Sequence, residues 1–419
     1  SGLIPMISRP LLRFTPVLIL LSTSLVLARD FVVTDYGAVG DGVTLDSPAI
    51  NAAIEAASAA GGGTIKFPAG DYLSYSLRLH SHVTLHLSPG SRLIAADPPS
   101  LGEPGGYDAP EENPWNFYQD FGHSYFRNSL IWGEGLENVG ITGSGQIYGR
   151  GLSRGNSRIA APLGSPPPAP IDGLLPDVLV ADGPYDYDPH PLLKPGPFGH
   201  PQARDILPAG TANKAIALKN CRNVTLRDFT ILHGGHFGIF TAGVDNLTID
   251  NLTIDTNRDG MDIDGCSNVR ISNCSVNSPW DDAICLKSSH ALGDDRLTEN
   301  VTITNCFVSG FDEGTLLDGT RQTTWQTRGR PHGRIKLGTE SGGGFRNIAI
   351  SNVVFEHCRG LALEQVDGGV LEDIVIANVT MHDVLNAPIF IRLGARLRHP
   401  TATNAGSVRR ILINNLVAW

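Results

Sequence analysis

A short phrase recurs along the second half of the chain and constrains the fold more than any other feature. Each copy begins with Asn or Asp, continues with alternating apolar residues and carries a second Asn or Asp five residues later. Repeats of about 22 residues with variable insertions are typical of a solenoid in which each repeat forms one coil. The sequence therefore predicts an all-β fold, a parallel β-helix. The six copies begin at Asn223, Asn246, Asn268, Asn300, Asn347 and Asp373, with spacings of 23, 22, 32, 47 and 26 residues.

The alternation within each phrase predicts two short strands separated by a polar corner. We expect each corner asparagine to hydrogen-bond to the same position one coil away. Cys274 and Cys306 occupy equivalent positions of neighbouring coils, and we interpret them as buried thiols rather than a disulfide. The apolar side chains eight residues into each phrase are expected to stack in the interior; they are Ile231, Ile254, Val276, Val308, Phe355 and Met381.

The first part of the chain departs from the repeat. Residues 1–28 carry basic residues and then an apolar run, which predicts a signal peptide and hence a secreted or periplasmic protein. Residues 46–60 are rich in alanine with helical spacing, and we expect a short helix, N-capped by Asp46, that covers the open end of the solenoid. Strands are expected at residues 63–67, 83–87 and 139–147.

We treat residues 29–419 as a single β-helix catalytic domain. Residues 151–210 are rich in proline and glycine, and we interpret them as a long insertion between coils. The last residues read like the middle of another coil, so the C-terminal end is expected to be incomplete.

Charge and cysteine content narrow the possible partners. A net charge of −10 argues against a nucleic-acid partner, which would favour a basic surface. The six cysteines form neither a dense disulfide framework nor a spacing typical of zinc. We expect a monomer that needs no metal and no other cofactor, and that does not associate with a membrane once the signal peptide is removed.

The repeat register predicts a row of ionisable side chains. Counting 13 residues from the start of four consecutive phrases gives His236, Asp259, Asp281 and Glu313, and Asp282 lies beside Asp281. Parallel strands lie about 4.8 Å apart, so these side chains are expected to follow one another along the solenoid. Stacked carboxylates cannot all ionise freely, and one that stays protonated can act as a general acid while another activates water. Two alternatives are a solvated acidic corner and a calcium site.

Arg334 and Lys336 follow the acidic row and point to the same face of a predicted strand. Two cations beside carboxylates suit a sugar that carries its own carboxylate, because Arg can bind such a group through two hydrogen bonds. The alternative is that both residues form ordinary salt bridges with the acidic row.

These motifs resemble those of the polygalacturonase family, glycoside hydrolase family 28. The Asn-Thr-Asp signature of the family is similar to Asn257-Arg258-Asp259, its Gly-Asp-Asp signature is similar to Trp280-Asp281-Asp282, and its Arg-Ile-Lys signature is complete at residues 334–336. The stretch from Tyr36 also resembles the opening coil of pectin-degrading β-helix enzymes, and the likeness extends over residues 30–419.

The resemblance implies a right-handed parallel β-helix and hydrolysis with inversion at the anomeric carbon. It implies that Asp281 is the general acid, that Asp259 and Asp282 activate water, and that Arg334 and Lys336 hold a galacturonate carboxylate. The expected substrate is a pectic polymer or oligosaccharide, either polygalacturonan or rhamnogalacturonan. We also list Asn257, Glu313 and His236 as candidate substrate contacts, although a packed corner position is an equal alternative for His236.

Glu313 stands where the family signature Gly-His-Gly carries its histidine, in Asp312-Glu313-Gly314. This departure favours a rhamnogalacturonan-acting or an exo-acting enzyme over an endo-polygalacturonase, and the insertion at 151–210 supports the exo mode. Two other functions remain open: a calcium-dependent polysaccharide lyase of the pectate-lyase type, and a glycan-binding β-helix without enzyme activity.

Overall fold

The computed structural model describes residues 29–100, 103–116, 118–120, 122–153, 209–323 and 331–419, together with Gly2 and Leu207. The expected signal peptide at 1–28, apart from Gly2, and most of the expected insertion at 151–210 lie outside these residues. Both therefore stay predictions.

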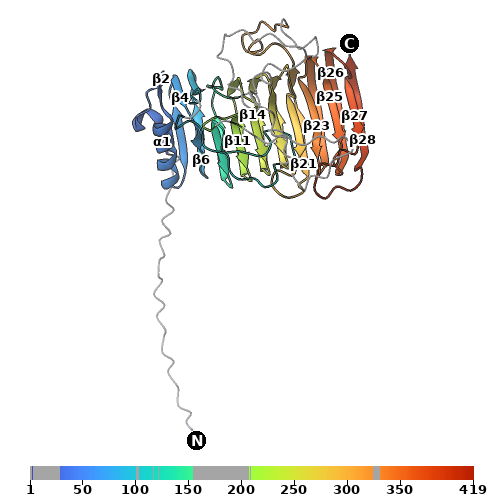
Figure 1. Cartoon of the computed structure of the whole chain (residues 1–419), viewed down its shortest axis with the longest axis horizontal. Helices are drawn as coiled ribbons and strands as arrows, with labels where there is room; N and C mark the ends of the chain where they lie inside the picture. The colour runs from blue at the N-terminus through green and yellow to red at the C-terminus, as the bar shows by residue number, and fades with distance from the viewer. Residues whose placement is uncertain are drawn as a thin grey trace.

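The described residues form a solenoid of parallel strands that runs from α1 at one end to β28 at the other (Figure 1). One sheet has nineteen strands: β1 (Asp30–Val32), β2 (Asp41–Leu45), β3 (Gly63–Phe67), β4 (Gly70–Ser74), β6 (Val83–Leu87), β7 (Ser91–Ala95), β9 (Glu137–Thr142), β10 (Gln146–Tyr148), β12 (Arg222–Arg227), β13 (Thr230–Leu232), β15 (Asp245–Asp250), β16 (Thr253–Asp255), β18 (Ser267–Ser272), β19 (Ser275–Asn277), β21 (Thr298–Thr304), β22 (Phe307–Ser309), β24 (Phe345–Cys358), β26 (Val370–Val384) and β28 (Ser407–Ala418).

The second sheet has nine strands, and it carries the candidate site described below. Its members are β5 (Leu77–Arg78), β8 (Ile131–Glu134), β11 (Lys214–Lys219), β14 (Phe237–Ala242), β17 (Asp259–Asp264), β20 (Ile284–Ser288), β23 (Arg334–Ser341), β25 (Gly360–Gln365) and β27 (Ile389–Leu393).

The central coils repeat the same three strands, whereas β24, β26 and β28 each replace the first two strands of a coil. β18, β19 and β20 form one coil, and they pair in parallel with β21, β22 and β23 of the next coil. The predicted interior column is confirmed, because Ile231 pairs with Ile254, which pairs with Val276, and Val276 pairs with Val308. These side chains belong to one continuous hydrophobic core that runs through the solenoid.

Most corner asparagines form the expected ladder, whereas Asn268 donates to Asp245 and Asn273 donates to Asp250 instead of to the same position one coil away. Asn246 Nδ2 donates to Asn223 Oδ1 at 2.8 Å, and Asn378 Nδ2 donates to Asn352 Oδ1 at 3.1 Å. Asn223 and Asn246 have φ values of 57° and 59°, a left-handed conformation that Asn tolerates better than most residues. Asparagine thus supplies both the bend in the backbone and the hydrogen bond that joins neighbouring coils.

The expected helix is present as α1 (Ser47–Ala59), and it follows a 3-10 turn, η1 (Val33–Tyr36). Ile50 and Ile54 of α1 are fully buried against the first coils. The expected capping contact is wrong in detail. Asp46 occupies the N-cap position, but its carboxylate accepts hydrogen bonds from Val39 N at 2.7 Å and Gly40 N at 3.0 Å. The preceding loop, rather than the helix, takes up this side chain.

The strands expected at 63–67 and 83–87 are confirmed as β3 and β6, whereas the one expected at 139–147 is two strands, β9 and β10. All six cysteines are buried and free, which confirms the interpretation of Cys274 and Cys306 as thiols. Among the described residues, no helix has the length and apolar character needed to span a membrane.

Candidate active site

The candidate residues meet at the N-terminal ends of three neighbouring strands of the nine-stranded sheet. Asp259 is the first residue of β17, Asp281 and Asp282 precede β20, and Arg334 is the first residue of β23. β17 pairs with β20 and β20 pairs with β23, so the three acidic residues and the two cations come from adjacent coils.

The structure brings Asp259, Asp281 and Asp282 together, but the predicted row is wrong by one residue in its register. Met261 pairs with Ile284, and Gly260 N donates to Asp282 O at 2.9 Å, so Asp259 lies level with Asp282 rather than with Asp281. On the other side Asp259 pairs with Phe237, which leaves His236 one position before the row. The strands stay in register while the corners between them differ in length by one residue, and the fixed count of 13 did not allow for this.

Glu313 is not part of the row. It lies in the segment between β22 and β23, and β23 supplies the next strand of the sheet in its place. Its carboxylate oxygen lies 2.6 Å from His233 Nδ1, and the following backbone is held by Asp255, whose carboxylate accepts from Gly314 N and Leu316 N. The expected stacking of Glu313 is therefore wrong, because an inserted segment interrupts the repeat at this coil. Its role as a substrate contact stays a prediction.

His236 and Asn257 are buried at the edges of the site. The His236 ring packs edge-on against Phe237, with 4.5 Å between the ring centroids. Asn257 accepts a hydrogen bond from Trp280 N through its backbone oxygen at 3.1 Å, which joins the two corners that carry the acidic residues. Substrate contacts by these two residues also stay predictions.

Asp282 is the shared ion-pair partner of both cations, Arg334 and Lys336, and we call it the anchor of the site. Its carboxylate is 1% exposed, one oxygen forms an ion pair with Arg334 Nε, and the other lies 2.9 Å from Lys336 Nζ. Burial by itself would raise the pKa of Asp282, but the positive charges of Lys336, Arg334 and Lys287 outweigh burial and lower it. Asp282 is therefore ionised throughout the neutral range.

Asp281 is the most accessible of the three carboxylates, with 25% of its side chain exposed. Arg258 Nη2 lies 3.1 Å from Asp281 Oδ2, and Ser278 Oγ donates to the Arg258 backbone oxygen at 2.5 Å. Burial raises the pKa of Asp281, but Arg258, His332 and Lys336 together outweigh burial, so the net shift is downward. In the sequence, Arg258 stood out only because it replaces the Thr of the family signature. In the structure, Arg258 is the positively charged residue that pairs with Asp281.

Asp259 has the opposite electrostatic character. Burial raises its pKa well above the usual range, and the charges of Asp281 and Asp262 raise it further. Asp259 therefore keeps a proton to higher pH than Asp281 and Asp282, because the pKa values of those two carboxyls are lowered. Because the carboxylates are coupled, the proton is best assigned to the group of them rather than to one residue alone.

The site as a whole suits an anionic ligand. Three cations, Arg258, Arg334 and Lys336, face two ionised carboxylates, which leaves a surplus of one positive charge when Asp259 is protonated. A locally positive site inside an acidic protein is what binding of a carboxylate-bearing sugar requires.

Two further residues belong to the site although sequence reasoning gave them little or no weight. His332 offers a nitrogen that lies within 4.8 Å of carboxylate oxygens of both Asp281 and Asp282, and burial lowers its pKa to about 4, so it is neutral at pH 7. Lys287 is buried in β20, 3.1 Å from Glu340 and 3.7 Å from Asp262. Lys287 could have been found from the sequence, because it lies in an otherwise apolar strand, and a buried lysine needs acidic partners.

Comparisons with known proteins agree with the fold and with the resemblance. Residues 31–92 match a family model described as rhamnogalacturonase A/epimerase, pectate lyase-like, and residues 214–407 match one described as a right-handed β-helix region. A solved structure of a hyperthermoactive exopolygalacturonase from Thermotoga maritima has a TM-score of 0.64 and 22% identity, covering 93% of this chain and 81% of that one. The chain is a right-handed parallel β-helix.

Curated relatives extend the likeness to most of the chain. An exo-poly-α-D-galacturonosidase of Dickeya chrysanthemi is 25% identical over 384 residues, which cover 86% of this chain and 56% of the relative. A probable polygalacturonase of Vitis vinifera is 25% identical over 370 residues, which cover 83% of this chain and 60% of the relative. The resemblance to polygalacturonases of glycoside hydrolase family 28 is thus confirmed, and the chain spans somewhat more than half the length of these relatives.

Proposed function

We propose that this chain is a glycoside hydrolase that cleaves galacturonic-acid-containing bonds of pectin. The observation that carries the proposal is the group of Asp259, Asp281 and Asp282 at adjacent strand ends, in which the pKa of one carboxyl is raised and the pKa values of the other two are lowered. Hydrolysis of a glycosidic bond needs one carboxyl that gives a proton to the leaving oxygen and one that activates water. The likeness to polygalacturonases over most of the chain supports the same substrate class.

Asp281 is the residue we assign as the proton donor, because it is the accessible carboxylate of the coupled group. Asp281 has to take up a proton, from Asp259 or from solvent, before it can protonate the leaving oxygen, and the ionised Asp282 takes up a proton from the attacking water. Arg334 is the more exposed of the two cations paired with Asp282, and it is the group that we expect to contact the carboxylate of galacturonate.

Removal of the charge on Arg258 tests the assignment of Asp281. Arg258→Gln takes away a cation 3.1 Å from the carboxylate, so the pKa of Asp281 should rise. If Asp281 is the acid, the alkaline limb of the plot of kcat against pH should move to higher pH, because the acid keeps its proton longer. Movement of the acidic limb instead would assign Asp281 as the base. Arg227→Gln, which changes an exposed arginine paired with Asp228, is the matched control and should move neither limb.

We further propose that cleavage is exo-acting and proceeds with inversion, and that the enzyme is secreted. The likeness to an exo-poly-α-D-galacturonosidase supports the exo mode, and inversion follows from the family resemblance. Product analysis tests the exo mode: galacturonate or one short product should dominate early in a digest of homogalacturonan. An early mixture of oligomers of many lengths would contradict it. The configuration of the first-formed product, read by proton NMR, tests inversion.

The polysaccharide-lyase alternative can be separated by a spectroscopic assay. Asp281 and Asp282 are already paired with Arg258, Arg334 and Lys336, so a calcium ion would have to displace three cations. We expect reducing ends to appear from polygalacturonate without an ultraviolet-absorbing product, and addition of calcium should not raise the rate. An absorbing, calcium-dependent product would identify a lyase.

A further inference from the structure

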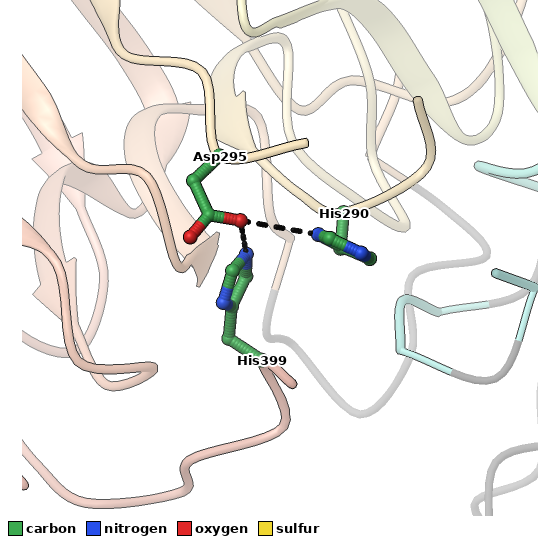
Figure 2. A group of neighbouring side chains, drawn as sticks. All are labelled: His290, Asp295 and His399. Carbon is green, nitrogen blue, oxygen red and sulfur yellow. Dashed lines mark hydrogen bonds and ion pairs between the residues drawn. The ribbon is translucent and has the colours of Figure 1, made fainter. Parts of the chain in front are cut away.

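A second group of ionisable side chains lies outside the proposed catalytic centre. His290 and Asp295 come from the loop between β20 and β21, and His399 comes from the segment between β27 and β28. Figure 2 shows that both histidine rings direct a nitrogen at the same oxygen of Asp295. His290 Nδ1 lies 3.2 Å from Asp295 Oδ1, and His399 Nε2 lies 2.7 Å from that oxygen.

The hydrogen bonds around Thr401 determine which nitrogen of His399 carries hydrogen. Thr401 Oγ1 donates its one proton to Asp295 Oδ2 at 3.0 Å, so it must accept from His399 Nδ1, which lies 3.1 Å away. A neutral His399 then directs the lone pair of Nε2 at a carboxylate oxygen 2.7 Å away. This contact lacks hydrogen-bond geometry, and Nε2 is a buried nitrogen without a hydrogen-bond partner. Two electron-rich atoms held this close call for a positive charge at this position, which either a proton on Nε2 or a metal ion can supply.

The geometry and the donor types fit a metal ion. One ligand atom of each of the three residues lies within 4.8 Å of the others, and His290 and His399 are each only 6% exposed. Asp295 is 41% exposed at its side chain, which leaves a path for an ion to enter. Two imidazole nitrogens and one carboxylate oxygen suit zinc and similar transition metals, whereas calcium and magnesium prefer oxygen ligands alone.

We propose that His290, Asp295 and His399 form a binding site for a divalent transition metal of the zinc type, with water in the fourth position. The ion would join the loop after β20 to the segment after β27. That segment also carries Arg398, which lies 2.8 Å from Glu340, and Glu340 in turn holds Lys287 of β20. The proposed ion therefore fastens a loop that packs against the buried charges beside the candidate active site. His399 lies far from His290 and Asp295 in the sequence, which is why residue spacing predicted no metal.

Binding can be measured without reference to catalysis. The purified chain is stripped with a chelator, and zinc is titrated back in competition with a chromophoric chelator. We expect one equivalent to bind, and the same site should take up cobalt with visible absorption bands. At zinc concentrations about 100 times Kd, the melting temperature should rise by about 3 °C, whereas calcium and magnesium should have little effect.

Variants locate the binding site on the chain. His399→Ala and His290→Ala should each weaken zinc binding at least about tenfold, in line with the loss of one of three ligands. His80→Ala, which changes a partly exposed histidine paired with Glu55, is the matched control and should leave zinc binding unchanged. Thr401→Val removes the hydroxyl that orients His399, and it should weaken binding less than either histidine change.

Absence of stoichiometric zinc binding to the stripped wild-type chain would overturn the proposal even if a variant failed to fold. Equal binding by wild type and a folded His399→Ala variant would also overturn it. Neither result depends on hydrolysis of pectin, so failure of this site and failure of the proposed function can be told apart.

Discussion

Replacement of Asp281 by Asn should lower kcat on homogalacturonan at least about 100-fold while the protein stays folded, because general acid catalysis contributes about that much or more. The substitution keeps the shape of the side chain and removes the acidic proton that the carboxyl group can donate. Asp281 is partly exposed, and we expect only a small change in the free energy of unfolding. Steady-state kinetics and thermal unfolding on the same preparations provide the test.

Asp228→Asn is the control for this substitution. Asp228 lies at an exposed corner of the nineteen-stranded sheet, where it contacts Arg227 and Asn251. Its loss should leave kcat unchanged. If Asp281→Asn retained more than about a tenth of the wild-type kcat, the assignment of Asp281 as the acid would be contradicted.

Replacement of Asp282 by Asn should abolish activity and also destabilise the fold. It leaves Arg334 and Lys336 largely buried without their shared counter-charge, and breaking a buried ion pair in this way costs about 3–5 kcal/mol. Denaturant unfolding measures this loss. The double change Asp282→Asn with Lys336→Met should recover part of the stability but no activity, since it removes one of the uncompensated charges. If the free energy of unfolding of Asp282→Asn lay within about 1 kcal/mol of the wild-type value, the role of Asp282 as the shared partner of the two cations would be contradicted.

The stability difference for Asp282 should also depend on pH in a defined direction. The folded protein lowers the pKa of this carboxyl, so its contribution is complete above the pKa of an unfolded Asp, about 3.9, and is lost as pH falls toward the folded value. The difference in unfolding free energy between wild type and Asp282→Asn should therefore be constant above about pH 5 and should narrow below it.

The fold could be predicted from the sequence because strand residues obey a strict register. Val276 and Val308 pair as expected, and the asparagines at 223 and 246 combine a corner conformation with a hydrogen bond to the next coil. Each repeat contains both the alternating apolar residues and the corner asparagines that determine these positions. An apolar side chain moved by one residue would point to the opposite face of the strand.

The site was less predictable, because it is built from corners instead of strands. Corner lengths vary by one residue without cost to strand pairing, which shifted His236 out of the row and brought Asp282 level with Asp259. Insertions have a larger effect on where a side chain lies. The segment inserted before β23 places Glu313 beside His233 instead of in the row. The ion pair between Arg258 and Asp281 depends on the direction of a long side chain, and the repeat pattern does not predict this direction.

Hydrolysis carried out in water enriched in the heavy oxygen isotope tests the central claim most directly. If the carboxylates of the site activate water, mass spectrometry should find one heavy oxygen at each newly formed reducing end of homogalacturonan products, and the Asp281→Asn variant should form such products far more slowly. Products without the isotope, or no cleavage by the wild-type chain, would contradict a hydrolytic centre at these three aspartates.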